Sequence, residues 1–121
     1  MIVAGFGYRT GADVSSLRAA LALAQAGHPP VTALAAPADK TALLEPLAEA
    51  LAVPLIVVTP AALCAFPTPT RSAVSIAARG TGSVAEAAAL AAAGEGAWLI
   101  SPRHVSPDRM ATCAIARGFP R

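Results

Sequence analysis

Short apolar runs bounded by glycine, proline and polar residues recur along the chain. Runs of this kind are typical of strands buried in a sheet. They predict strands at residues 1–4, 31–35, 55–58, 97–100 and 110–116. The run 55–58 is apolar at every position and rich in β-branched residues, as expected for a parallel sheet that is covered on both faces.

Helical periodicity fills most of the segments between these runs. Leu17, Leu21 and Ala24 share one face of a helix that begins at Asp13 or Ser15 and reaches residue 26. A second helix is predicted over residues 40–51, with Asp39 as its cap. Pro46 lies inside that range, so the helix either kinks there or starts its first turn later. Thr59-Pro60 starts a short third helix.

The turn Gly80-Thr81-Gly82-Ser83 stands directly before an alanine-rich helix over residues 84–93. Ser83 is the expected N-cap, and Glu86 three residues later completes a capping box. Backbone N–H groups at such a helix start, together with the helix dipole, form an anion site. Two readings remain open: an anion-binding turn, or a capped helix that binds nothing.

The alternation of strands and helices predicts one α/β domain over residues 1–121. We expect a three-layer α/β/α fold with a mostly parallel, mixed sheet, in which the last strand pair adds an antiparallel edge. Ligands of such folds bind beyond the carboxyl ends of the strands. The predicted loop 5–11 lies on that rim. The turn 80–83 joins it only if residues 74–78 form a strand, and their apolar length fits a strand or a helix equally.

The predicted loop 5–11 carries candidate binding chemistry. Gly5, Gly7 and Gly11 allow close approach of the backbone to a ligand. Arg9 offers a planar cation suited to a carboxylate, and Tyr8 either stacks on a flat ring or packs against the protein. Three more side chains are predicted on loops near the same rim: Lys40, Arg103 and His104. Each could instead be ordinary solvated surface, and for Arg103 and His104 that alternative is favoured.

Composition narrows the function classes. With 55% hydrophobic and 13% charged residues, the 121-residue chain is expected to be folded. A net charge of +2 is too small to indicate a nucleic-acid partner. No apolar run reaches the roughly 18 residues of a membrane span, and no signal peptide is evident, so we expect a cytoplasmic protein without a membrane partner.

Metal and nucleotide motifs are missing from the sequence. Cys64 and Cys113 show no metal-ligand spacing with one another or with the two distant histidines, so neither a metal nor another cofactor is expected. Gly5-x-Gly7 lacks the spacing of a dinucleotide site, and no acidic residue ends the second predicted strand. No Walker A motif is present.

The chain resembles the CobE / CbiG C-terminal domain family of cobalamin biosynthesis over nearly its full length. The resemblance rests on residues 3–11, 80–88 and 113–117 and on Lys40. It implies a compact α/β/α fold and the stand-alone form of the aerobic pathway, whereas two-domain relatives open the lactone of a cobalt-precorrin and release acetaldehyde. Family members often have cysteine where Tyr8 stands, which excludes a thiol nucleophile here, and an acidic residue where Leu43 stands.

The resemblance therefore implies an auxiliary protein that binds a precorrin or corrin intermediate and that works beside other enzymes of the pathway. Its carboxylates would meet the N–H groups and hydroxyls of the turn 80–83, Arg9 and Lys40, with Tyr8 and Phe6 beside the ring. No catalytic residue is assigned. The alternatives are a lactone hydrolase, with Lys40 or His104 as base, and a scaffold that hands intermediates between enzymes. The expected binding residues are Gly5, Gly7, Tyr8, Arg9, Gly11, Lys40, Gly80, Thr81, Gly82 and Ser83.

Overall fold

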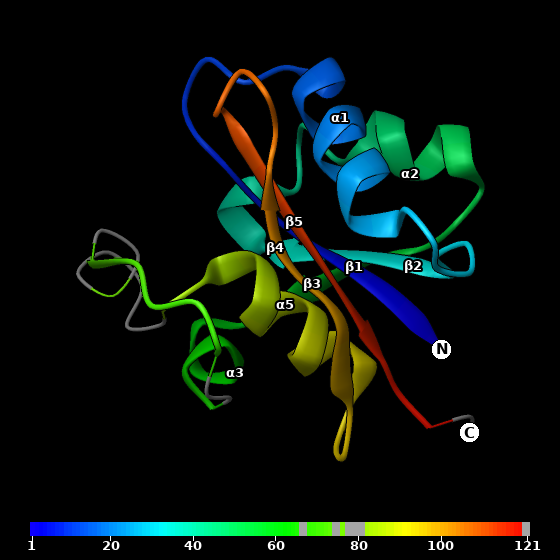
Figure 1. Cartoon of the computed structure of the whole chain (residues 1–121), viewed down its shortest axis with the longest axis vertical. Coiled ribbons are helices and arrows are strands. Elements are labelled where there is room, and N and C mark those ends of the chain that lie inside the picture. The colour runs from blue at the N-terminus through cyan, green and yellow to red at the C-terminus, as the bar shows by residue number, and fades with distance from the viewer. Residues whose placement is uncertain (66–67, 74–75, 77–81, 120–121) are drawn as a thin grey trace.

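The computed structural model describes residues 1–65, 68–73, 76 and 82–119. Within them, five strands form one mixed sheet with the order β3-β2-β1-β5-β4 (Figure 1). β1, β2 and β3 are parallel, β5 is antiparallel to β1, and β4 is antiparallel to β5. Since β4 thereby runs in the direction of β1, only β5 is reversed, and the predicted mostly parallel sheet with an antiparallel pair is confirmed. The strands are β1 (Ile2–Tyr8), β2 (Ala33–Pro37), β3 (Leu55–Val58), β4 (Trp98–Val105) and β5 (Ala111–Arg117).

Helices cover both faces of the sheet and make three layers (Figure 1). Leu17 and Leu47 pack with Phe6 of β1 in the core on one face. Leu63 packs with Val3 of β1 in the core on the other. Because successive side chains of a strand point to opposite faces, β1 contributes to both cores. The helices are α1 (Val14–Gln25) and α2 (Glu45–Leu51) on the first face, and α3 (Pro60–Cys64) and α5 (Val84–Ala93) on the second.

The helix ends follow the capping residues of the sequence. Asp13 caps α1 and forms a reciprocal box with Ser16, and the Thr59 hydroxyl accepts from the Ala62 N–H at 3.2 Å at the start of α3. α2 begins only at Glu45, with Pro46 in its first turn, where the missing N–H costs no hydrogen bond. The later start of this helix is therefore confirmed. The predicted Asp39 cap is wrong, because residues 38–40 form a separate 3₁₀ turn.

β1 extends through Tyr8, so the prediction of a loop from Gly5 onward is wrong. Antiparallel pairing with β5 holds the strand from Ile2 to Tyr8. α5 also lies against this part of the strand. A Cβ added at Gly5 would lie 2.1 Å from the carbonyl oxygen of Ala85 and 2.5 Å from the Ala89 nitrogen. The glycine is required by the close approach of strand and helix rather than by a loop.

Two further segments differ from their predicted structure. β4 continues to Val105, where a polar loop was expected from residue 101, and only residues 106–110 join it to β5. β2 begins at Ala33, two residues later than expected. Of the run 74–78, only Ile76 is described; it is helical, and its N–H donates to the Ser72 carbonyl at 2.9 Å.

Candidate ligand-binding site

A pocket of about 330 Å³ lies where the carboxyl ends of β1, β2 and β4 meet the first residues of β5 and α5. α5 runs antiparallel to β1. Val84 at its start lies beside Gly7 near the end of β1, and Ala93 at its end lies beside Gly118, whose N–H donates to the Met1 carbonyl just before β1. Its positive N-terminus therefore faces the pocket. The pocket therefore lies at the sheet rim where the strand pattern predicts ligand binding.

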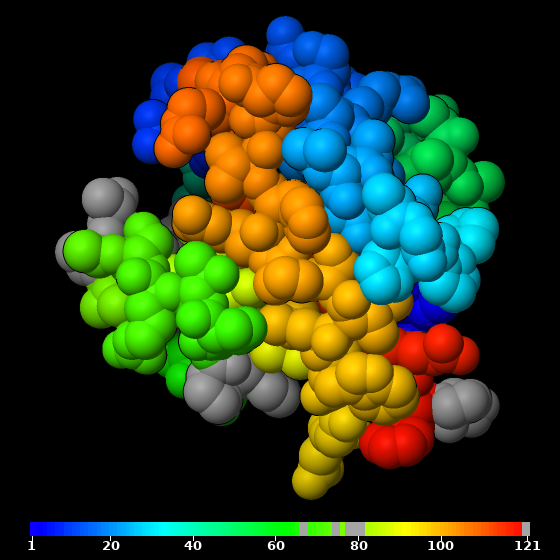
Figure 2. All heavy atoms as spheres, in the orientation of Figure 1, coloured from blue at the N-terminus to red at the C-terminus, as the bar shows by residue number. Residues whose placement is uncertain are grey.

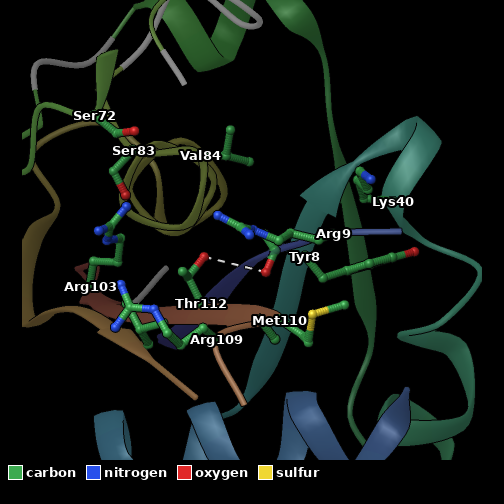
Figure 3. A pocket seen from close by; sticks show the side chains of 13 residues that line it. Tyr8, Arg9, Lys40, Ser72, Ser83, Val84, Arg103, Arg109, Met110 and Thr112 are labelled. Carbon is green, nitrogen blue, oxygen red and sulfur yellow. Dashed lines mark hydrogen bonds between the residues drawn. The ribbon is translucent and has the colours of Figure 1, made fainter. Parts of the chain in front are cut away.

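Four cationic side chains line the pocket: Arg9, Lys40, Arg103 and Arg109. They are four of the nine lysine and arginine residues of the chain. No aspartate or glutamate lines the pocket within the described part of the chain. Figure 3 shows that the four come from separate segments around the opening, so an anion here meets positive charge from several sides.

The sequence predicts Arg9 and Lys40 at this rim, favours solvated surface for Arg103 and does not single out Arg109. Both missed arginines line the pocket because β5 lies between β1 and β4, which brings the end of β4 and the β4–β5 turn to the rim. Arg109 has a φ of 61°, a left-handed conformation that is uncommon for a residue with a Cβ. The predicted antiparallel pairing of the last two strands is the sequence signal from which the place of Arg109 in the turn between them could have been predicted.

Tyr8 lies beneath Lys40. The Lys40 Nζ stands 4.8 Å from the centroid of the Tyr8 ring, which is the geometry of a cation–π contact. Both side chains line the pocket and are half-buried. Phe6 has no exposed surface and belongs to the core shared with α1 and α2, so its expected place beside a ligand ring is wrong.

The predicted glycines divide into two groups. Gly7 lines the pocket, and its carbonyl accepts from the Thr112 hydroxyl at 3.3 Å, the bond drawn as a dashed line in Figure 3. Gly5, Gly11 and Gly82 do not line it. Gly11 has a φ of +96° in the turn after β1, and Gly82 is buried against Thr70. Gly80 and Thr81 lie outside the described residues.

Ser83 lines the pocket and caps α5, as expected. Its hydroxyl accepts from the Glu86 N–H at 3.3 Å, and the side chain is 1% exposed. Ser83 thus lies at the rim, whereas the run 74–78, on which that expectation depended, lies outside the described residues except for Ile76. The expected capping box is incomplete, because the Glu86 carboxylate does not accept from the Ser83 N–H. It accepts from Thr70 and Arg103 instead.

Two further titratable side chains of the described residues, His104 and Cys113, lie away from the pocket. His104 does not line it, and its Nδ1 lies 2.7 Å from the Pro102 carbonyl oxygen. Burial in β5 raises the pKa of the Cys113 thiol far above its ordinary value. Within the described residues, no group of three or more His, Cys, Asp or Glu side chains could hold a metal ion. Nor does that part of the chain contain a helix with the length and apolarity needed to cross a membrane.

Comparison with known proteins adds a family to this geometry. The family described as "Cobalamin synthesis G C-terminus" matches residues 2–116. The crystal structure of CobE, a protein from the cobalamin (vitamin B12) biosynthetic pathway, is similar with a TM-score of 0.87 and 33% identity, covering 100% of this chain and 92% of that one. Cobalamin biosynthesis protein chiG from Agrobacterium tumefaciens has a TM-score of 0.72 and 34% identity over 99% of this chain and 100% of its own.

A third solved structure shares the fold alone. A putative cobalamin biosynthesis protein G homolog from Sulfolobus solfataricus is 20% identical with a TM-score of 0.70, and the match covers 95% of this chain but 36% of that one. No curated protein matches the chain. The family match over almost the whole length, together with two relatives above 30% identity, establishes that the chain belongs to the CbiG C-terminal / CobE family of cobalamin biosynthesis proteins.

Proposed function

We propose that this protein binds a precorrin or corrin intermediate through the pocket at the carboxyl ends of β1, β2 and β4, in an auxiliary role in the cytoplasmic aerobic pathway. The observation that carries the proposal is the set of four cations around a pocket to whose lining the described residues contribute no carboxylate. Precorrins and corrins carry acetate and propionate carboxylates around a flat macrocycle. Guanidinium groups are well suited to such carboxylates because they bind them in a bidentate manner.

The size of the pocket indicates how the ligand is held. Ligand pockets that enclose a drug-sized molecule measure about 300–1,000 Å³. At about 330 Å³ this pocket is at the lower limit, and a tetrapyrrole is larger than a drug-sized molecule. The pocket therefore takes carboxylate arms along one edge of the macrocycle, with the Tyr8 ring available as a flat apolar contact beside them.

Energetics support a useful affinity. A hydrogen bond to a charged group contributes about 1.5–3 kcal/mol. At the upper value, four such bonds less an association cost of about 4 kcal/mol leave about 8 kcal/mol, which corresponds to a dissociation constant of about 1 μM.

A hydrolase needs a base beside the reacting bond. Among the described lining residues there is no carboxylate, histidine or cysteine. Of the two residues suspected from sequence, His104 lies outside the lining, and Lys40 lies over the Tyr8 ring. These placements favour binding over lactone opening.

Titration with hydrogenobyrinic acid tests the proposal. We expect micromolar binding by the wild type and at least about tenfold weaker binding by an Arg9→Ala, Arg103→Ala double variant, equivalent to about 1.4 kcal/mol. Arg18→Ala, which removes an exposed arginine of α1 outside the pocket, is the matched control and keeps the wild-type affinity. Absence of binding at tens of micromolar, or equal affinity of the double variant, contradicts the proposal. Release of acetaldehyde from a lactone-containing intermediate would favour the hydrolase instead.

A further inference from the structure

Glu86 is a buried carboxylate that the binding pocket alone does not explain. It is the third residue of α5, and its side chain has an exposed fraction of 0%. One carboxylate oxygen, Oε1, accepts from the Thr70 N–H at 2.9 Å. The other, Oε2, accepts from the Thr70 hydroxyl at 3.0 Å and from the Arg103 N–H at 2.9 Å. Each of these three groups, all on described residues, is a donor, and the two carboxylate oxygens are the acceptors.

The N–H of Arg103 is available to Glu86 because β4 is irregular at this point. Ser101 pairs with Ile115 and His104 pairs with Cys113, so two residues of β4 lie opposite one residue of β5. A bulge of this kind leaves a backbone group outside the ladder and redirects the side chains beside it. Glu86 takes the N–H of Arg103, and the side chain of Arg103 lines the pocket.

The bonds to Thr70 hold the segment 68–72, which contributes Ser72 to the lining of the pocket. The Ser72 N–H donates to the Gly82 carbonyl at 2.8 Å, which holds residues 68–72 across the start of α5. Gly82 permits this contact, because a Cβ there would lie 2.3 Å from the Thr70 carbonyl oxygen. Ser72 lines the pocket. One buried carboxylate thus ties α5 both to the segment that carries Ser72 and to the strand that carries Arg103.

We propose that Glu86 is a positioning residue for the anion pocket: without lining the pocket, it fixes Arg103 and the segment 68–72, which carries Ser72, in the arrangement that receives the carboxylates of the ligand. This inference rests on the proposed binding function. The spacing of Glu86 from Ser83 suggests a reciprocal helix cap. The proposed role of Glu86 is instead to support ligand affinity.

The variant Glu86→Gln tests the inference directly. It keeps the size of the side chain but places an NH₂ donor against donors on Thr70 or Arg103. We expect a folded protein by circular dichroism that binds hydrogenobyrinic acid about tenfold more weakly. Glu49→Gln, the same substitution at an exposed position of α2, is the matched control and retains the wild-type dissociation constant.

A double-mutant cycle separates positioning from a general structural role. If Glu86 acts through Arg103, the weakening caused by Glu86→Gln shrinks on an Arg103→Ala background and persists in full on an Arg9→Ala background. The same factor on both backgrounds overturns the inference. If Glu86→Gln does not fold, Thr70→Val, which removes only the hydroxyl donor, takes its place with a smaller expected weakening.

Amide hydrogen exchange of the ligand-free protein keeps the inference testable if hydrogenobyrinic acid does not bind at all. In Glu86→Gln, the Arg103 amide is expected to exchange at least about tenfold faster than in the wild type, while the Leu90 amide inside α5 is unchanged. Unchanged exchange at Arg103 overturns the inference on its own. Failure of the wild type to bind, with faster exchange at Arg103, overturns the proposed ligand instead.

Discussion

At the scale of single residues, Gly5 determines how closely α5 lies against the sheet. The contacts that a Cβ would make there, at 2.1 and 2.5 Å, are with backbone atoms of Ala85 and Ala89. Backbone atoms cannot rotate away as a side chain can, so the helix itself would have to move. Since Val84 and Ser83 at the start of α5 line the pocket, the same displacement would change the site.

Gly5→Ala is therefore expected to lower the free energy of unfolding by about 3 kcal/mol, the upper end of the usual cost of overpacking. Gly27→Ala is the matched control: its φ is +78°, but nothing lies within 4 Å of the added Cβ. Gly27→Ala is expected to lower the free energy of unfolding only by the left-handed backbone strain, about 1 kcal/mol. Urea unfolding of both variants measures the difference. Equal losses would show that α5 does not press on Gly5.

At the scale of elements, the β4–β5 hairpin is tied to α1 through Asp108. The Ser16 hydroxyl donates to one oxygen of Asp108 at 2.6 Å, and the Ser106 hydroxyl and the Met110 N–H donate to the other. These bonds hold the pKa of Asp108 below its ordinary value, with the Ser106 hydroxyl as the largest cause and the Ser16 hydroxyl next. The turn they fix carries Arg109 and Met110, both of which line the pocket.

A depressed pKa in the folded state gives a definite pH dependence. The stability that Asp108 contributes is fully present above its unfolded pKa of about 3.9 and is lost as the pH falls through the lower folded value. Asp108→Asn is therefore expected to be less stable than the wild type at about pH 7, with a difference that narrows toward about pH 3. Thermal unfolding at several pH values measures this. A constant difference across that range would contradict the prediction.

At the scale of the whole molecule, the distribution of charge matters more than its sum. The net charge is only +2, yet four of the nine basic residues surround one pocket. In Figure 2 the edge strand β4 and the β4–β5 turn lie in orange on the visible face of the molecule; they carry Arg103 and Arg109. A local positive field of this kind attracts polyanions even on a nearly neutral protein.

Affinity for hydrogenobyrinic acid should therefore fall as salt is added, because the Debye length shortens from about 10 Å at 0.1 M to about 3 Å at 1 M. Calorimetric titrations across that range give the slope. The Arg9→Ala, Arg103→Ala double variant should show a shallower slope than the wild type, and Arg18→Ala the wild-type slope. Salt-independent binding would indicate that apolar contacts with the ring dominate.

Local sequence was sufficient for much of the architecture. The all-apolar run 55–58 forms β3, and Thr59 and Ser83 cap their helices as predicted. α2 starts late, at Glu45, which was one of the two outcomes predicted from Pro46. Each of these features depends on neighbours within one helical turn or one strand. The same local information placed Arg9 and Lys40 at the carboxyl ends of strands, where both line the pocket.

Gly5, Arg109 and Glu86 show what local sequence left undecided. A glycine before a polar turn reads as loop, and only the packing of α5 against β1 shows that it lies in a strand. Arg109 lies at the pocket because β5 is inserted between β1 and β4. Glu86 bonds to the Arg103 N–H and not to its own helix start, because a bulge in β4 leaves that N–H available. The sequence by itself determined the order of elements, the sheet rim and two of the four cations, because periodicity and capping are local. The tertiary structure alone decided which distant segments complete the site, because strand order and register arise from pairing between residues far apart in the chain.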